Sequence, residues 1–331
     1  MDHIAIVILT YNGIGLLKKF LPTVINHSGS HYIIIVDNAS QDGTVEYIKG
    51  EYPQIQCIQH KENYGFAAGY NKALRKIRAK YYVLLNNDVE VTPQWLEPLE
   101  ELMEGDLAIA ACQPKVLSIN SREKFDYAGA AGGFIDTFGY SFCRGRIFST
   151  LEEDHGQYND VIPIFWASGA CLFIRSTVFH QLGGFDHRFF SHFEEIDLCW
   201  RIQHQWKVYY HGGSHVYHLG GGTIGKHNPH KTYLNFRNNR LMLYKNSKQH
   251  YKIRLRGILD GIAALYMLLR GKPKHTMAII KAQRDFQKMK KAYSPSSHLM
   301  PISNVYQGSI IFDYFFRGVK YFASLNQKKI K

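Results

Sequence analysis

The stretch Tyr81-Tyr82-Val83-Leu84-Leu85-Asn86-Asn87-Asp88-Val89 combines a continuous apolar run with an abrupt polar end. A run of this kind is typical of a central strand in a parallel sheet, both faces of which are covered. In open α/β sheets, ligands bind beyond the carboxyl ends of the strands. Asn86, Asn87 and Asp88 therefore stand where a ligand is expected, although Asn and Asp also favour turns through their own hydrogen bonds.

Short apolar runs alternate with helical patterns through the first hundred residues. Strands are predicted at 4–9, 32–36, 55–58 and 81–85, with helices beginning near residues 14, 43 and 66. This βαβαβαβ order predicts a doubly wound, mostly parallel sheet with right-handed crossovers. Polar residues also follow the first two strands, and they are Thr10, Tyr11, Asn12 and the segment 37–40.

The pattern is less regular beyond residue 90. A helix is predicted from Pro93 to residue 104, and a strand at 107–113. A second buried strand should end at residue 175, after the small-residue turn 166–170. The Gly- and Phe-rich segment 128–148 is predicted to form loops.

Composition narrows the class of protein. The 331-residue chain is 45% hydrophobic and 20% charged, as expected for a globular protein with one large domain and an appendage. Its five cysteines are odd in number and widely separated, so neither a disulfide framework nor a structural zinc site is expected. The short apolar run 4–9 predicts neither a signal peptide nor a membrane anchor, which favours a cytoplasmic protein.

The net charge of +13 is concentrated in the tail. Residues 1–225 carry 18 Lys or Arg and 24 Asp or Glu, whereas residues 226–331 carry 22 and 3. The apolar stretch 258–269 of this tail has helical spacing but is too short to span a bilayer, which needs about 20 apolar residues. A second stretch, 310–325, carries its polar residues along one helical stripe. Both stretches are amphipathic helices that attach to an anionic membrane surface, or else pack on the body or form a homodimer; the sequence leaves these alternatives equal.

Common nucleotide-binding loops are missing from the sequence. No Gly-x-Gly-x-x-Gly follows the first predicted strand, and no Gly-x-x-x-x-Gly-Lys-Ser/Thr loop occurs. Histidines crowd the segment 204–230, but the sequence has no His-Glu-x-x-His. Dinucleotide dehydrogenases, P-loop NTPases and zinc proteases are therefore disfavoured.

Several motifs stand apart in the sequence but keep a fixed order. They are Val7-Ile8-Leu9-Thr10-Tyr11-Asn12, Val36-Asp37-Asn38-Ala39-Ser40, Leu85-Asn86-Asn87-Asp88, and the segment 189–201 with Glu194-Glu195-Ile196-Asp197 at its centre. Together they resemble inverting glycosyltransferases of family 2, which have the GT-A fold, and the segment 63–71 is similar to the rhamnosyltransferase-like branch. The resemblance covers residues 4–245. It implies a catalytic domain at 1–245, with nucleotide-sugar binding in 1–115 and an acceptor part in 116–245, followed by a basic helical extension at 246–331.

The resemblance also assigns the donor side of the site. Asp37 is similar to the residue that accepts the N–H of a uracil or thymine ring, and Asn86 to the residue that contacts the ribose. Further contacts to the nucleotide-sugar are implied for Thr10, Tyr11, Asn12, Asn63 and Asn87, and leaving-group or loop-closing contacts for Arg237 and Asn238. A turn role for Asp37 and close helix-to-sheet packing at Gly65 remain open as structural alternatives.

Asp88 and His218 are implied as ligands of Mg²⁺ or Mn²⁺, ions that bridge to phosphate oxygens. His218 precedes the Gly-rich turn 219–223, where the family has a metal-ligating or phosphate-contacting histidine. The widespread family pattern is Asp-Xaa-Asp, whereas Asn86-Asn87-Asp88 offers one formal charge instead of two. We therefore expect the cation to bind weakly without the donor diphosphate.

Inverting transfer needs a general base for the acceptor hydroxyl. The resemblance places Glu195 in this role, where most relatives have Asp, with Glu194 as the fallback and Asp197 as a third acid of the motif. Ordinary helix chemistry is the alternative, because acids suit a first helical turn and Asp197 has the spacing of an i, i+4 pair with Arg201.

The leading hypothesis is a metal-dependent inverting hexosyltransferase of bacterial surface polysaccharide biosynthesis. It would move a sugar from a UDP- or dTDP-sugar, with dTDP-rhamnose favoured by the branch resemblance, to a glycan or lipid-linked acceptor. Such an enzyme is expected in the cytoplasm or on the inner face of the cytoplasmic membrane, without a nucleic-acid partner. The alternatives are a nucleotidyltransferase of sugar phosphates and a non-catalytic basic protein that binds membranes or nucleic acid.

Overall fold

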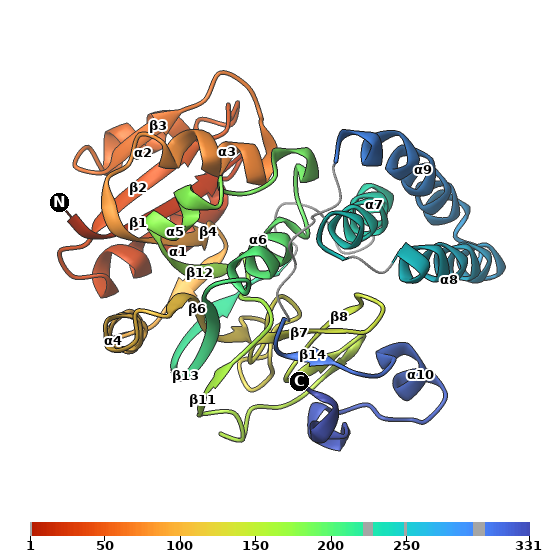
Figure 1. Cartoon of the computed structure of the whole chain (residues 1–331). Helices are drawn as coiled ribbons and strands as arrows, with labels where there is room; N and C mark the ends of the chain where they lie inside the picture. Colours follow the sequence, from red (N-terminus) through yellow and green to blue (C-terminus); the bar gives the residue numbers. More distant parts are fainter. Residues whose placement is uncertain (1, 221–227, 248–249, 294–301) are drawn as a thin grey trace.

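The computed structural model describes residues 2–220, 228–247, 250–293 and 302–331. Its first part consists of β1 (Asp2–Thr10), α1 (Ile14–His27), β2 (Tyr32–Asp37), α2 (Thr44–Glu51), β3 (Gln56–Gln59), α3 (Gly65–Leu74), β4 (Ala79–Asn86) and α4 (Glu97–Gly105). Figure 1 shows these elements at the left of the molecule. The predicted βαβαβαβ order is confirmed.

A central sheet is formed by strands between residues 2 and 218. Its later strands are β5 (Val89–Val91), β6 (Ile109–Ser118), β11 (Val161–Pro163), β12 (Cys171–Arg175) and β13 (Lys207–His218). Among the described residues the sheet has nine strands in the order β11-β13-β6-β12-β4-β1-β2-β3, with β5 paired to β13. Strands β3, β2, β1 and β4 pair in parallel, as do β6 and β13, whereas β12 runs antiparallel between β4 and β6. The mostly parallel, doubly wound fold class is confirmed.

The strands are apolar throughout because both faces of the sheet are covered. In β1, Val7 belongs to a core shared with α3, while Ile6 and Ile8 belong to a second core shared with α1 and α4. Leu84 and Leu85 of β4 divide between the two cores in the same way. Successive side chains of a strand point to opposite faces, so a two-sided core requires a continuous apolar run.

Residues 128–148 contribute strands instead of the predicted loops. A second sheet is made of β7 (Gly133–Asp136), β8 (Ser141–Cys143), β9 (Arg146–Ile147), β10 (Thr150–Leu151) and β14 (Val305–Tyr306). These strands are too short to show a period of two, and β14 pairs with β7 from the opposite end of the sequence. The predicted strand 107–113 also begins later and continues to Ser118 as β6.

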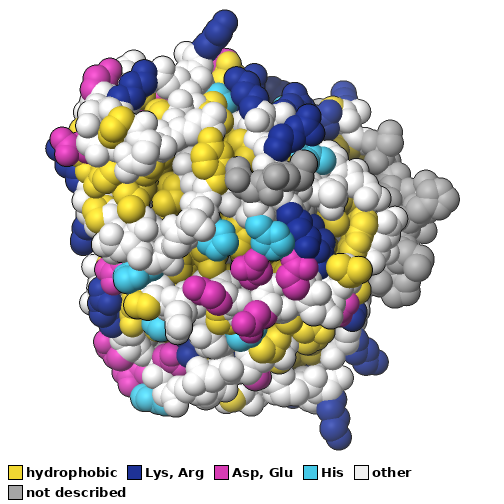
Figure 2. Space-filling view, turned by 90° about the vertical axis from the view of Figure 1, so that its left-hand side faces the viewer, with side chains coloured by type: hydrophobic (Ala, Val, Ile, Leu, Met, Phe, Trp, Pro, Cys, Tyr) yellow, Lys and Arg dark blue, Asp and Glu magenta, His cyan; other side chains and the backbone are white. Residues whose placement is uncertain are grey.

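The further helices are α5 (Ser176–Gln181), α6 (Glu194–Ile202), α7 (Pro229–Asn246), α8 (His250–Leu269), α9 (Pro273–Met289) and α10 (Ile310–Phe315). Helices α7 and α9 start with proline, whose fixed φ suits a first turn. Helix α7 packs against α9 and α8, and Figure 1 shows the three side by side at the right of the molecule. The face on the other side carries acids and histidines near its middle and Lys or Arg mostly toward its edges (Figure 2).

The C-terminal segment packs on the second sheet. The predicted helix 310–325 stops at Phe315, because Gly318 takes a left-handed φ of 70° and Phe322 lies in a separate 3-10 turn. The ring of Phe322 lies 5.1 Å from that of Phe134 on β7, measured between centroids. Among the described helices, none combines the length and apolar character that crossing a bilayer requires.

Candidate functional site

Three strands bring the predicted donor residues to one edge of the sheet. Strands β1 and β2 pair Thr10 with Asp37, and β1 and β4 pair Leu9 with Asn86. The side-chain amide of Asn87 donates a 2.8 Å hydrogen bond to Oγ1 of Thr10. Residues predicted from three separate motifs therefore lie together at the ends of β1, β2 and β4.

The loops beyond β1 and β2 are tied to each other around Asp37. The buried Asp37 carboxylate accepts hydrogen bonds of 3.1 and 3.3 Å from the backbone N–H of Ser40. The N–H of Asn12 donates to Oγ of Ser40, and Oδ1 of Asn12 accepts from the N–H of Gln41, both at 2.8 Å. The turn role considered for Asp37 is thus present, and it orients the carboxylate at the sheet edge. Tyr11 is exposed on the first loop.

The first backbone N–H groups of α3 have hydrogen-bond partners within the protein. Oδ1 of Asn63 accepts a 2.9 Å hydrogen bond from the N–H of Gly65. The N–H groups of Phe66 and Ala67 donate to the carbonyl oxygen of Phe190 at 2.7 and 3.2 Å. Gly65 has φ 74°, and a Cβ there would lie 2.5 Å from the Phe190 ring. Close packing therefore explains Gly65.

Asp88, His218 and Asp126 form a buried row. His218 ends β13 and pairs with Val89, the residue after Asp88. Its Nε2 lies 3.1 Å from Oδ1 of Asp88, and its Nδ1 lies 2.8 Å from Oδ1 of Asp126. The backbone N–H of Leu219 donates to the carbonyl oxygen of Asp88 at 3.0 Å. The two predicted metal ligands are therefore adjacent, with a second carboxylate behind the imidazole.

Asp88 and His218 could bind a divalent cation whose remaining ligands are water or phosphate oxygens. Burial lowers the basicity of His218, but the hydrogen bonds and charges of Asp126 and Asp88 outweigh it and raise its pKa to about 10. A cation at Nε2 would take the place of that proton, since a metal needs the neutral imidazole. A carboxylate on the other ring nitrogen is usual for metal-binding histidines.

The described residues hold no group of three or more His, Cys, Asp or Glu placed to bind a metal by themselves. The donor set at Asp88 and His218 therefore fits Mg²⁺ or Mn²⁺ completed by phosphate and water. Residues 221–223 of the predicted Gly-rich turn lie outside the described residues.

Helix α6 presents two carboxyl groups in its first turn, that of the buried Glu194 and that of the half-buried Glu195. Burial raises the pKa of Glu195 to about 7. Burial and the neighbouring charge of Glu195 raise the pKa of Glu194 well above its ordinary value. Within the described part of the chain, Oε2 of each residue has no hydrogen-bond partner. Buried acids without partners are costly, and a pKa near neutrality suits a general base.

Gly169 connects Glu195 to the sheet edge. A Cβ at this position would lie 3.9 Å from Cδ of Glu195 and 3.4 Å from the ring of Phe66 on α3. The next residue, Ala170, accepts a 3.0 Å hydrogen bond from the backbone N–H of Asn86. One turn therefore contacts both the predicted base and the end of β4.

The carboxylate of Asp197 bonds to side chains of α6 and α7. Its buried carboxylate accepts from Nε of Arg201 and Nζ of Lys245, both at 2.9 Å. The side-chain amide of Asn246 donates a third hydrogen bond of 2.7 Å. The i, i+4 pair considered from the sequence is formed, and Asp197 anchors α6 to α7.

The segment that enters α6 has an unusual backbone. Phe190, His192 and Phe193 have positive φ values of 65°, 69° and 73°. Each such non-glycine residue costs about 1–3 kcal/mol unless its surroundings hold it. The strain lies directly before the two acids of α6.

Helix α7 holds this segment in place. The side-chain amide of Asn238 donates to the carbonyl oxygens of Phe189, Ser191 and His192 at 2.8–2.9 Å. Arg237 donates from Nη2 to the carbonyl oxygen of Phe189 at 2.9 Å and from Nε to Oδ1 of Asn238 at 2.8 Å. Of the two roles implied for Arg237, these contacts favour loop closing.

Asp126 is a residue of this site that sequence reasoning missed. It lies in Asp126-Tyr127-Ala128-Gly129, where an aspartate before small residues is typical of a turn. It does form that turn, because Oδ1 accepts a 2.8 Å hydrogen bond from the N–H of Ala128. Only the pairing of β13 with β5 and β6 brings His218 to it, so no local signal could have found it.

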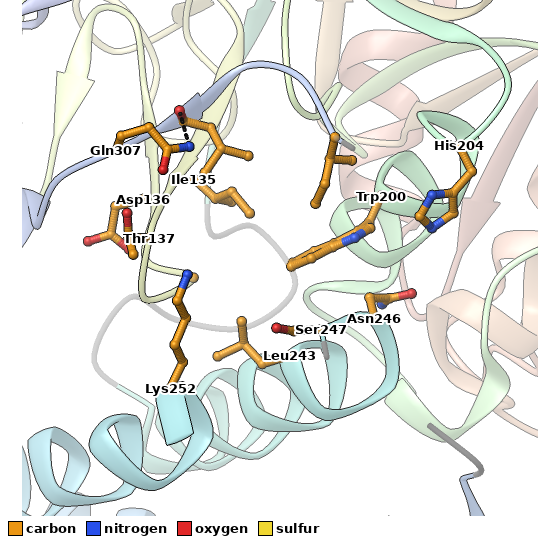
Figure 3. A pocket seen from close by; sticks show the side chains of 13 residues that line it. Ile135, Asp136, Thr137, Trp200, His204, Leu243, Asn246, Ser247, Lys252 and Gln307 are labelled. Atoms are coloured by element: carbon orange, nitrogen blue, oxygen red, sulfur yellow. Dashed lines mark hydrogen bonds between the residues drawn. The ribbon is translucent and has the colours of Figure 1, made fainter. Parts of the chain in front are cut away.

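A cavity of about 280 Å³ lies between α6, α7, the start of α8 and the second sheet. Figure 3 shows Trp200 of α6 and Lys252 of α8 at its borders, with Asp136 and Thr137 of the second sheet across from Trp200. Its lining residues differ from those at the strand ends. The cavity is therefore separate from the strand-end site, although α6 borders it.

Known proteins similar to this chain include rhamnosyltransferases. An N-acetylglucosaminyl-diphospho-decaprenol L-rhamnosyltransferase of Mycobacterium tuberculosis is 22% identical over 242 residues, covering 68% of this chain and 78% of the relative. The rhamnosyltransferase WbbL of Escherichia coli is 26% identical over 204 residues, covering 60% of this chain and 75% of the relative.

Solved structures share the fold. GalNAc-T7, solved with UDP, GalNAc and Mn²⁺, has a TM-score of 0.57 at 16% identity over 88% of this chain and 56% of its own. The mannosyltransferase PcManGT of Pyrobaculum calidifontis, solved with GDP-Man and Mn²⁺, has a TM-score of 0.52 at 12% identity over 86% of this chain and 87% of its own. The family model described as glycosyl transferase family 2 matches residues 5–183, more than half of the chain. The chain therefore belongs to glycosyl transferase family 2, as a rhamnosyltransferase-like glycosyltransferase of glycan biosynthesis with the GT-A fold.

Proposed function

We propose that this enzyme transfers a sugar, with inversion, from a UDP- or dTDP-sugar to a glycan or lipid-linked acceptor in bacterial surface polysaccharide biosynthesis. The rhamnosyltransferase relatives make dTDP-rhamnose the first donor to test. The observation that carries the proposal is the carboxyl of Glu195, whose buried Oε2 has no hydrogen-bond partner among the described residues. It lies beside the Gly169-Ala170 turn, which also contacts the end of β4.

The donor would lie along the ends of β1, β2 and β4. Asp37 would accept the N–H of the base, and Asn86 would contact the ribose, with Thr10, Asn87 and Asn63 shaping the same edge. Tyr11 and Asn12, on the first loop, would cover the nucleotide. Asp88 and His218 would hold Mg²⁺ or Mn²⁺, which when bound neutralises charge on the departing diphosphate.

Glu195 would act as the base. Its carboxylate takes the proton of the acceptor hydroxyl while the hydroxyl oxygen bonds to the anomeric carbon and the bond from that carbon to the diphosphate breaks. The nucleoside diphosphate leaves with the electron pair of the broken bond. Glu194 is the fallback base, whereas Asp197 and Arg237 would position α6 and the segment before it.

A donor panel tests the proposal. Purified enzyme is incubated with UDP- and dTDP-sugars, Mn²⁺ and a glycan or lipid-linked acceptor, and the anomeric configuration of the product is determined by NMR. We expect transfer from one donor with a configuration opposite to that of the donor sugar. Retention of configuration, or no transfer from any nucleotide-sugar, would contradict it.

A further inference from the structure

Helix α8 buries a pair of charged side chains and exposes large apolar ones. Its buried face contains an ion pair, in which Nε of Arg256 donates to Oδ1 of Asp260 at 2.9 Å. Its outer face carries large apolar side chains that are 42 to 78% exposed, and they are Leu255, Ile258, Ile262, Leu265, Tyr266, Leu268 and Leu269. A surface helix normally buries its apolar side and exposes its charges. A face of this kind is therefore built to be covered.

The exposed apolar residues form one continuous stripe. Leu255, Ile258, Ile262, Leu265 and Leu269 follow each other at intervals of three or four residues along a single α-helix. Residues at this spacing lie above one another on one side of a helix. Met277 and Ile280 of α9, which packs against α8, are exposed as well. We call these seven residues, with Tyr266 and Leu268, the outer face of the α8–α9 hairpin.

Basic residues surround this outer face. Residues 250–293 contain eleven Lys or Arg but only two acids. One acid is the buried Asp260, and the other, Asp285, accepts a 2.9 Å hydrogen bond from the Tyr233 hydroxyl. Arg254 is exposed near the start of α8, and Arg270, Lys272 and Lys274 are exposed where α8 turns into α9. The hairpin therefore offers apolar surface bordered by cationic groups.

The charges favour a membrane over a second copy of the chain as the occupant. Two hairpins packed face to face would bring like charges together in either orientation, because both ends of α8 are basic and no exposed acid of α8 could pair with them. An anionic bilayer accepts the apolar side chains among its acyl chains and the Lys and Arg side chains at its headgroups.

We propose that the outer face of the α8–α9 hairpin docks this enzyme in the plane of an anionic membrane. The docking refines the proposed function, since it would bring the enzyme to lipid-linked acceptors. The proposed docking surface does not include the segment 310–325, whose Phe322 packs on the second sheet. Figure 1 shows the hairpin at the right-hand edge of the molecule, away from the strands of the central sheet.

Vesicle co-sedimentation of the full chain tests the docking. We expect binding at low salt to vesicles of phosphatidylglycerol and phosphatidylcholine, and much weaker binding to phosphatidylcholine alone. In the triple variant Ile258→Gln, Ile262→Gln and Leu265→Gln, the bound fraction should fall at least about tenfold. The matched control is Phe312→Gln with Phe316→Gln, which removes exposed apolar side chains of α10 and of its C-cap and should bind like the parent.

Two further measurements separate the outcomes. Analytical ultracentrifugation should give the same molecular mass for the parent and the triple variant, and a parent dimer that the triple variant dissociates would overturn the proposal in favour of self-association. No binding of the parent to anionic vesicles at low salt would also overturn it. Transfer to a water-soluble acceptor analogue should be equal in both proteins, so failure of docking is distinguishable from failure of the transferase proposal.

Discussion

Nδ1 of His218 lies 2.8 Å from Oδ1 of Asp126, on the side of the ring opposite to Asp88. The contact fixes the plane of the imidazole and leaves Nε2 toward Asp88. Because Asn86-Asn87-Asp88 offers a single carboxylate, the orientation of His218 would matter for holding the proposed cation.

Asp126→Asn should lower the affinity of the site for its cation, although Asp126 is not itself a proposed ligand. The amide can still bond to the imidazole, but it loses the charge that makes the ring a better ligand, and such changes lower metal affinity about 10- to 100-fold. We expect a higher Mn²⁺ activation constant in the presence of donor, with kcat largely recovered at saturating metal. Glu153→Gln, which changes a half-exposed acid, is the control. An unchanged activation constant for Asp126→Asn would assign the residue a structural role only.

Glu195→Gln should remove the base and keep the donor site. The amide has nearly the same shape but cannot accept a proton, so kcat should fall about 10²- to 10⁴-fold while the Kd of the nucleotide-sugar stays the same. Glu194→Gln is the paired variant and should lose less activity. If Glu194→Gln loses activity and Glu195→Gln does not, the fallback assignment replaces the first.

The pH dependence follows from the raised pKa of Glu195. Burial raises it to about 7 from an ordinary value of 4.5, so the carboxylate form needed for catalysis accumulates as the pH rises through about 7. We expect kcat to increase over this range and then level off. A rate that falls as the pH rises from about 6 to 8 would contradict a carboxylate base with this pKa.

The same pKa predicts a stability effect. A carboxyl whose pKa is raised by folding stabilises the native state fully below its unfolded pKa of 4.5, and this contribution is lost as the pH rises through about 7. Glu195→Gln removes the dependence. Its Tm should therefore exceed that of the parent by more at about pH 8.5 than at about pH 5, measured by calorimetry. A Tm difference that does not change with pH would show that Glu195 is not held in its protonated form by burial.

Asn238→Ala should release the strained segment before α6. It removes the donor to three carbonyl oxygens, so we expect a loss of about 1–3 kcal/mol in unfolding free energy and a clear drop in kcat. Asn239→Ala is the matched control, since Asn239 donates a buried 2.7 Å hydrogen bond to the carbonyl oxygen of Gly139, away from this segment. The control should lose stability but keep kcat. Equal losses of kcat in the two variants would mean that the segment needs no support from Asn238.

The sequence predicted those parts of the protein that have local patterns. The strands that end at Thr10, Asp37 and Asn86 are apolar on both faces, and parallel pairing brings their ends together. The second sheet could not be predicted, because its strands are short and β14 comes from the far end of the chain. The continuous helix predicted at 310–325 was wrong, since α10 ends at Phe315, Gly318 takes a left-handed φ, and Phe322 packs on that sheet from a separate 3-10 turn.

The candidate site also has one part that local sequence patterns predict and one part that they do not. Residues within motifs, such as Asp88 and Glu195, could be proposed from spacing and resemblance. Contacts that only the tertiary fold makes could not be predicted. Examples are the contact of the Asp126 carboxylate with His218 and the hydrogen bonds from Lys245 and Asn246 to Asp197. The reversed polarity of α8 also needed the structure, because a helical apolar pattern alone does not say which side is buried.

Thermal shift with a nucleotide-sugar, with and without Mn²⁺, tests the central claim most directly. A ligand that binds only the native state raises Tm, and the shift grows as the ligand binds more tightly. We predict a small shift with Mn²⁺ alone, a large shift with the matching UDP- or dTDP-sugar and Mn²⁺ together, and loss of that joint effect in Asp88→Asn. A large shift with the nucleotide-sugar that needs no metal and persists in Asp88→Asn, or no shift with any nucleotide-sugar, would contradict a cation held by Asp88 and His218 against the donor diphosphate.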